Sequence, residues 1–138
     1  MCGIVAYVGN KQAAPLLVEG LKRLEYRGYD SAGVAITTPQ GVEYARSVGR
    51  VSVLEELINA DPRKYDGTLG IAHTRWATHG EPTEANAHPH TGTTASGHNI
   101  SLVNNGIIEN YRALRTYPEG KGHDFTSQTD TKVLAKLI

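Results

Sequence analysis

The chain has 138 residues, which is enough for one domain with a substantial core. Its 14 Lys and Arg residues balance 14 Asp and Glu residues, so the formal net charge of zero does not favour nucleic acid or an anionic membrane as a partner. The single cysteine excludes an internal disulfide and a cysteine-based metal site. A small neutral or zwitterionic ligand suits this composition better.

The sequence also lacks the patterns of export and of membrane insertion. Its first residues do not show the charged and then apolar pattern of a signal peptide. No apolar run approaches the roughly 18 residues that cross a bilayer. We therefore expect a cytoplasmic protein without a membrane partner.

The first third of the chain predicts a strand, a helix and a hairpin. Residues 4–8 form an apolar run typical of a strand. A helix follows, with Pro15 in its first turn and a buried face made of Ala13, Leu16, Leu17, Leu21 and Leu24. Residues 25–33 are rich in charge, tyrosine and glycine and predict a loop. Strands at 33–37 and 42–48 are expected to pair across the Pro-Gln-Gly turn between them.

The middle of the chain predicts a second helix and two more strands. Residues 52–55 match a capping box, in which serine and glutamate satisfy each other's backbone donors, and they open a helix that Asp61-Pro62 ends. Residues 69–73 and 99–103 predict strands. The stretch between them, 81–97, is polar and is expected to be a loop.

Three histidines lie in or beside this polar stretch, namely His79, His88 and His90. The His88-Pro89-His90 segment has no carboxylate or thiol at metal-ligand spacing, and the proline keeps His88 extended. We interpret these side chains as polar loop histidines and expect no metal site.

The last part predicts two helices. A helical segment passes through Tyr111 and Leu114, followed by a loop at 116–123 and a short strand at 124–127. The final helix starts at Thr129-Asp130, with an apolar face made of Val133, Leu134, Leu137 and Ile138. The chain stops inside this helix without a C-cap, which is the pattern of a domain that is cut short.

Cys2 is the first candidate for chemistry. After removal of the initiator methionine it would carry a thiol and a free α-amine on the same carbon, which is the arrangement of an N-terminal nucleophile with a built-in base. Gly3 would let other groups approach the thiol closely. The alternative is an inert cysteine that serves as a small apolar side chain.

Three further features suit the same chemistry. Arg75 leaves a predicted strand and can pair in bidentate fashion with a carboxylate, while Asp130 at a helix start can receive an ammonium group, so that together they would recognise a zwitterion. Asn105-Gly106 offers a side-chain amide beside an unhindered backbone N–H, a pair that can stabilise an oxyanion. The alternatives are a surface arginine, a capping aspartate and an ordinary Asn-Gly turn.

Six motifs carry a resemblance to a known family: CGIV at residues 2–5, RGYDSAG at 27–33, HTRWATHGEP at 73–82, NAHPH at 86–90, NGIIENY at 105–111 and TDT at 129–131. In order and approximate spacing they closely resemble the glutaminase domain of glutamine:fructose-6-phosphate amidotransferases, which are class II glutamine amidotransferases. The resemblance covers essentially the whole chain. RGYDSAG and HTRWATHG set it apart from the purine-pathway branch of the class. One departure is Asn104, where relatives commonly have histidine.

The resemblance implies an α+β fold, a four-layer αββα sandwich of the N-terminal nucleophile hydrolase type. It implies that residues 1–138 are part of a glutaminase domain that continues further, and that the sugar-phosphate isomerase domain is absent from this chain. It implies L-glutamine as substrate, no cofactor and no metal. The full-length enzyme is expected to be a homo-oligomer.

The resemblance also assigns roles to individual residues. Cys2 would be the nucleophile, Asn105 and Gly106 the oxyanion hole, and Arg27 would orient the cysteine and its amine. Arg75 would hold the α-carboxylate of glutamine and Asp130 its α-ammonium group. The residues that would help to bind the substrate are Trp76, Thr78, His79 and Gly106. In this family the loop that carries the tryptophan closes over the substrate.

The function implied is hydrolysis of L-glutamine to glutamate and ammonia through a cysteinyl thioester, with the ammonia supplied to glucosamine 6-phosphate synthesis from fructose 6-phosphate. Two alternatives stay open. One is the glutaminase of a different class II amidotransferase. The other is a catalytically silent fragment that binds glutamine or a partner chain.

Overall fold

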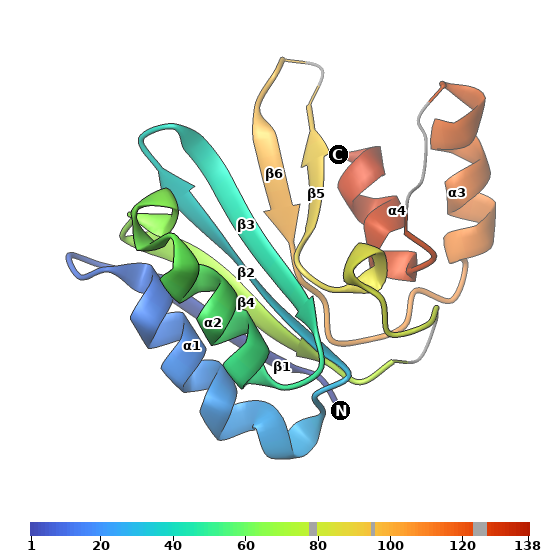
Figure 1. Cartoon of the computed structure of the whole chain (residues 1–138). Helices are drawn as coiled ribbons and strands as arrows, with labels where there is room; N and C mark the ends of the chain where they lie inside the picture. Colours follow the sequence, from blue (N-terminus) through green and yellow to red (C-terminus); the bar gives the residue numbers. More distant parts are fainter. Residues whose placement is uncertain (78–79, 95, 123–126) are drawn as a thin grey trace.

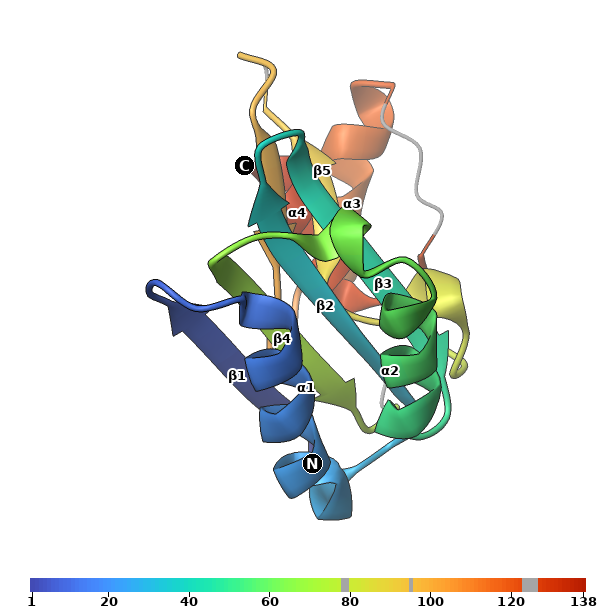
Figure 2. The same ribbon diagram turned by 60° about the vertical axis from the view of Figure 1, so that its left-hand side comes forward.

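The computed structural model describes residues 1–77, 80–94, 96–122 and 127–138. The predicted strand at 124–127 lies almost entirely outside these ranges. The described residues form four layers in the order helix, sheet, sheet, helix (Figures 1 and 2). The predicted α+β, αββα architecture is therefore confirmed for this part of the fold.

The larger sheet has four antiparallel strands in the order β1-β4-β2-β3. These strands are β1 (Gly3–Val8), β2 (Ser31–Thr38), β3 (Gly41–Val48) and β4 (Leu69–Arg75). A second sheet pairs β5 (His90–Thr93) with β6 (Asn99–Leu102). The strands of the hairpin β2–β3 and the strands β1, β4 and β6 were all predicted from the sequence, with ends that differ by one or two residues.

Two helices cover the outer face of the four-stranded sheet, α1 (Ala13–Leu24) and α2 (Val51–Ala60) (Figure 2). Their apolar faces bury Leu17, Leu21 and Leu54 completely. Leu16 is 40% exposed, so the buried face of α1 is rotated slightly from the predicted one and includes Ala14 and Val18 instead. Strand β2 is buried on both faces because the helices cover one side and the second sheet and its connections cover the other.

The predicted capping box is wrong, although the helix that it was meant to open exists. Helix α2 begins at Val51 after Arg50, so Ser52 lies inside the helix and makes no capping hydrogen bond. The first free backbone N–H, that of Val51, donates instead to the Glu25 carboxylate at 2.9 Å. A side chain from the short helix η1 (Glu25–Arg27) therefore satisfies the donor that a local serine was expected to satisfy.

The loops predicted at 81–97 and 116–123 are partly wrong. The first contains the short helix η3 (Glu84–Asn86) and strand β5, whose polar residues pair with β6. Helix α3 (Tyr111–Gly120) continues through Pro118 into the second. A proline removes one helical hydrogen bond, but its ring is buried here, so packing outweighs the local penalty.

Helix α4 (Asp130–Leu137) begins where predicted but buries a different face. Its buried residues are Asp130, Thr131, Lys132, Val133 and Ala135, whereas Leu137 and Ile138 are exposed. The polar members find partners: Lys132 Nζ, for example, donates to the Thr91 carbonyl at 2.6 Å. The apolar pattern alone misled the prediction because buried polar groups with hydrogen-bond partners do not show in it.

His73, His88 and His90 form a buried cluster between the layers. This corrects the prediction of polar loop histidines for His88 and His90, whereas His79 lies outside the described residues. The ring of His88 stacks on His73 with centroids 4.1 Å apart, and it lies 4.5 Å from the ring of His90. Each of the two outer rings is hydrogen-bonded. His73 Nε2 lies 3.0 Å from the Asn104 carbonyl oxygen, and His90 Nε2 lies 2.6 Å from Thr129 Oγ1.

Burial keeps these rings neutral. Loss of solvent lowers the pKa of His73 to about 4 and that of His90 to about 3, and it lowers the pKa of His88 further still. Within the described ranges, no group of histidine, cysteine or acidic side chains is arranged to hold a metal ion. None of the described helices has the length and apolar character that a membrane crossing requires.

The histidine cluster predicts how stability depends on pH. An unfolded histidine binds a proton near pH 6.5, whereas in the folded chain His73 does so only near pH 4. The unfolded state therefore binds more protons below neutrality, and the free energy of unfolding should fall as the pH is lowered from about 7 to about 5.5, a window in which ordinary carboxylates do not titrate. Thermal melts at fixed ionic strength measure this slope.

The exposed His98 provides a matched control. The variant His98→Gln should keep the wild-type slope of melting temperature against pH. A melting temperature that stays constant or rises on acidification would contradict the prediction, as would a slope that disappears in the His98 variant.

Candidate active site

The pairing of the strands gathers three chain segments at one end of the larger sheet. Gly3 at the start of β1 lies opposite Thr74 near the end of β4, and Ser31 at the start of β2 lies opposite Arg75. The residues just outside these strands therefore meet at the same end of the sheet, where the N-terminus lies (Figure 1). Cys2, Asp30 and Trp76 lie at this end.

Cys2 is fixed by the backbone of the residue that follows β4. The Trp76 N–H donates to the Cys2 Sγ at 3.4 Å, and the thiol lies 3.8 Å from the Trp76 carbonyl oxygen. Beside it, the Gly3 N–H donates to Thr74 Oγ1 at 3.1 Å. A Cβ atom at Gly3 would come within 2.8 Å of Leu24 Cβ, so only glycine allows this close approach.

The RGYDSAG segment wraps around the first residue of the chain. The Met1 amine donates to the Arg27 carbonyl at 2.7 Å, and the Arg27 guanidinium lies 3.4 Å from the Met1 sulfur. Gly28 has φ +151° and would bring a Cβ within 3.2 Å of the Met1 carbonyl oxygen. With Met1 attached, Cys2 has no free α-amine.

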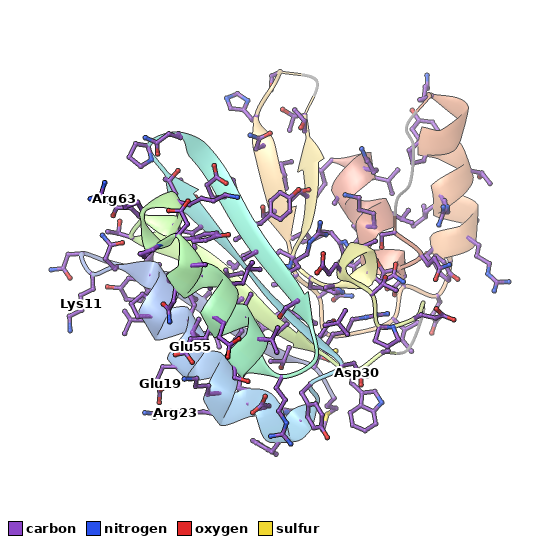
Figure 3. The ribbon with its side chains drawn as sticks, viewed as in Figure 1. Lys11, Glu19, Arg23, Asp30, Glu55 and Arg63 are labelled. Carbon is purple, nitrogen blue, oxygen red and sulfur yellow. The ribbon has the colours of Figure 1, made fainter. Side chains whose placement is uncertain are left out.

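Asp30 holds the turn after β4 in place. Its Oδ2 accepts a hydrogen bond from the Ala77 N–H at 2.8 Å, and its own N–H donates to the Arg75 carbonyl at 3.0 Å. Figure 3 shows Asp30 at the end of the sheet, away from the charged residues on the outer helices. Those residues make surface ion pairs, such as Lys22 with Glu55 and Arg23 with Glu19.

Arg75 is an almost fully buried cation, with 3% of its surface exposed. Its Nη1 donates to the Glu81 carbonyl at 3.1 Å and its Nη2 to the Gly80 carbonyl at 3.0 Å. Burial lowers the pKa of the guanidinium, while the acidic groups of Cys2, Asp30 and Asp130 act in the opposite direction. The planar guanidinium of a buried arginine can pair with a carboxylate ligand.

Asp130 is the first residue of α4 and is also buried. One carboxylate oxygen, Oδ2, accepts from the Ile108 N–H at 2.7 Å, and the other, Oδ1, accepts from the Thr131 N–H at 2.8 Å. The helix N-cap position belongs to Thr129, so Asp130 is not the capping residue.

These side chains line one small pocket of about 20 Å³. Its walls are Cys2, Arg75, Trp76, His88, Asn104, Gly106, Thr129, Asp130 and Thr131. Cys2, Arg75 and Asp130, from three distant parts of the chain, thus line the same space. Sequence reasoning did not assign His88, Asn104, Thr129 or Thr131 to the site, although each stands inside or beside one of the six motifs.

The remaining predicted site residues are placed differently. Trp76 lies at the rim with 55% of its surface exposed. Asn105 is exposed and is not among the pocket walls, whereas its neighbours Asn104 and Gly106 are. The Asn104 amide donates to the Gly106 carbonyl at 3.4 Å, which supports the turn between them. Thr78 and His79 lie outside the described residues.

Larger pockets exist elsewhere and do not contain these groups. One of about 600 Å³ lies between α1, α2 and the short helix η2 (Pro62–Tyr65), and one of about 410 Å³ lies between β3, the β5–β6 hairpin and α4. Neither contains the thiol or the buried arginine. The chemistry therefore points to the smallest of the three.

The curated relatives compared with this chain share one name. The sequence is 54% identical to a "Glutamine--fructose-6-phosphate aminotransferase [isomerizing]" of Thermus thermophilus, over 100% of this chain and 22% of the relative. It is 57% identical to the protein of that name from Acinetobacter baylyi, over 100% of this chain and 21% of the relative. The chain thus spans about a fifth of the length of these curated relatives.

Solved structures and a family model agree with this likeness. A glutamine phosphoribosylpyrophosphate amidotransferase from Bacillus subtilis, complexed with ADP and GMP, superimposes with a TM-score of 0.82 at 26% identity, over 99% of this chain and 29% of that one. A structure described as the allosteric regulatory enzyme of purine biosynthesis gives a TM-score of 0.84 at the same identity and coverage. The model of the glutamine amidotransferase domain matches residues 61–138, more than half of the chain. The chain therefore belongs to the glutamine amidotransferase domain family.

Proposed function

We propose that this chain hydrolyses L-glutamine to L-glutamate and ammonia through a thioester on Cys2. The observation that carries the proposal is that Cys2, Arg75 and Asp130 line one pocket. A zwitterionic amino acid needs one cation and one anion at its α-carbon end and a nucleophile at its side-chain amide. The pocket supplies all three.

Substrate recognition follows from the two buried charges. Arg75 pairs with the α-carboxylate and Asp130 with the α-ammonium group, each supported by the backbone contacts described above. We assign supporting roles to Trp76, Thr78 and His79. The pocket has room for about one water molecule, so glutamine enters only if its walls move apart, and the exposed Trp76 at the rim would cover the bound substrate.

The reaction then proceeds in two halves. The free α-amine of Cys2 takes the thiol proton, and the sulfur attacks the side-chain amide carbon of glutamine. Asn105 and the Gly106 N–H receive the negative charge that develops on the amide oxygen. The C–N bond breaks, the amine proton goes to the leaving nitrogen, and ammonia departs. Water attacks the thioester through a second oxyanion and releases glutamate and the free thiol.

The N-terminus must be processed before this chemistry. Arg27 contacts Met1 through both its carbonyl and its guanidinium. We propose that, once Met1 is removed, the same residue orients Cys2 and its new α-amine. The reaction as written needs neither metal nor cofactor.

The relatives suggest where the ammonia goes. We propose that in a longer protein it aminates fructose 6-phosphate to glucosamine 6-phosphate, on a linked sugar-phosphate isomerase domain, in a cytoplasmic homo-oligomer. Identity of 54% to proteins of that name, against 26% to the purine-pathway structures, favours this over another class II amidotransferase. A silent glutamine-binding fragment differs from both because it would release no ammonia.

The role of Cys2 as nucleophile can be tested by substitution. Replacement by alanine removes the nucleophile, so ammonia release from glutamine should fall by about 10³-fold or more, while circular dichroism stays unchanged. Intact mass spectrometry of the wild-type chain, paired with the same assay, should show that only the fraction lacking Met1 is active. Full activity in the alanine variant, or in chain that retains Met1, would contradict the mechanism.

Substitutions at Asn104 and Asn105 distinguish the roles of these two neighbouring amides. If Asn105 turns into the pocket and donates to the oxyanion, Asn105→Ala should lower kcat by about 10²- to 10³-fold with little change in KM. Asn104→Ala is the matched control, because that side chain supports the turn rather than the oxyanion, and its kcat should fall far less. The reverse ranking would assign the donor role to Asn104.

A substitution at Arg75 tests the proposed binding of the α-carboxylate of glutamine. Arg75→Lys keeps the charge but loses the planar, two-pronged donor, so KM for glutamine should rise by about 10- to 100-fold. The exposed Arg23→Lys on helix α1 serves as the control and should leave KM unchanged. Steady-state kinetics of glutamate formation decide the matter, and an unaltered KM in the Arg75 variant would argue against the assigned role.

A further inference from the structure

We infer that Asn86 is a positioning residue. It keeps Arg75 and Asp130 at the separation that the α-carboxylate and α-ammonium groups of an amino acid require. The inference rests on the proposed function and concerns the same site. Asn86 lies in the NAHPH motif, in η3, and is not among the pocket walls. It is 2% exposed, so its amide is a buried polar group that must be paired.

The amide nitrogen of Asn86 reaches the arginine side of the site. Its Nδ2 donates to the Glu81 carbonyl at 2.9 Å, and Arg75 Nη1 donates to that same oxygen at 3.1 Å. The carbonyl that anchors the guanidinium is therefore itself held by Asn86. Movement of the Asn86 side chain would move one of the anchors of Arg75.

The amide oxygen of Asn86 reaches the aspartate side. Its Oδ1 accepts from the Gln128 N–H at 2.7 Å and from the Ser127 hydroxyl at 3.1 Å. Ser127 Oγ in turn accepts from the Thr129 N–H at 3.1 Å, immediately before Asp130. One planar amide thus joins the 80–81 turn to the segment that leads into α4.

The directions of these hydrogen bonds extend the network to the histidine cluster. Ser127 has one hydroxyl proton, and Asn86 Oδ1 is an acceptor only, so Ser127 donates to it. The contact of 2.7 Å between Ser127 Oγ and Thr129 Oγ1 must then use the Thr129 proton, and His90 Nε2 must donate to Thr129. The donors therefore run in one direction, from His90 to Thr129, from Thr129 to Ser127, and from Ser127 to Asn86.

Close packing restricts the amide to this orientation. A Cβ atom at Gly80, where φ is +82°, would come within 2.8 Å of Asn86 Nδ2 and 3.0 Å of Gln128 Cβ. The Asn86 N–H donates to the Thr83 carbonyl at 3.1 Å, which fixes the backbone. Aspartate in this place would lose the donor and would set a carboxylate oxygen against the Glu81 carbonyl.

The consequence for catalysis is specific. Asn86 does not touch the thiol or the oxyanion turn, so its loss should disturb recognition of the α-carbon end and leave the chemical step largely intact. A role of this kind raises KM with little change in kcat. It also makes the effect of Asn86 depend on Arg75, because residues that share a partner are not additive.

The experiment compares Asn86→Ala with Asn59→Ala, an exposed asparagine at the end of α2, in steady-state glutamine hydrolysis by chain lacking Met1. Asn86→Ala should raise KM about tenfold or more while kcat stays within about threefold, and Asn59→Ala should match the wild type. In the Arg75→Lys background the same substitution should raise KM far less than tenfold. A general loss of stability would instead lower the apparent kcat, because less of the chain is folded, and would leave KM unchanged.

Ser127→Ala decides the matter if Asn86→Ala does not fold. It removes one hydroxyl from the network and should raise KM in the same direction by a smaller factor. The inference is overturned by unchanged KM in these variants, by a fall in kcat alone, or by equal effects in both backgrounds. A wild-type chain that neither hydrolyses glutamine nor binds glutamate in calorimetry would overturn the proposed function and this inference with it, whereas an active wild type with normal variants overturns the inference alone.

Discussion

The antiparallel pairing of β4 with both β1 and β2 is the constraint on which the candidate site depends. Its register places Gly3 opposite Thr74 and Ser31 opposite Arg75, so the start of two strands and the end of a third coincide. Cys2 and Trp76, 74 positions apart in the chain, then touch through a backbone N–H and a sulfur. A register shift of one residue would turn each side chain to the opposite face and separate these groups.

The second organising feature is the polar character of the space between the layers. His73, His88 and His90 are buried there as neutral rings, and Asn86, Ser127 and Thr129 pair with one another. Buried polar groups cost free energy unless their hydrogen bonds are made, so the bonds among Asn86, Ser127 and Thr129 favour one arrangement of the surrounding chain. That arrangement carries Arg75 on one side and Asp130 on the other.

Several features were predictable because their signals are local. The apolar run of β1, the helical spacing of α1, the hairpin β2–β3 and the start of α4 follow from periodicity and turn residues. The predicted face of α4 and the capping box at Ser52 failed because distant partners decided them: Thr91 accepts from Lys132, and Glu25 accepts from Val51. The histidines were misjudged for the same reason, since a polar sequence context says nothing about the layer that will cover it.

The sequence by itself determined which chemical groups are available: one cysteine beside the terminus, an arginine after a strand, an Asn-Gly pair and an aspartate at a helix start. Their motifs also pointed to the family. Only the tertiary structure decided that Cys2, Arg75 and Asp130 line one pocket, that Asn104 and His88 join its walls, and that Asn86 links its two sides. The reason is physical: periodicity reports spacing along the chain, whereas the pocket is made by strand pairing and hydrogen bonds between residues that the chain keeps far apart.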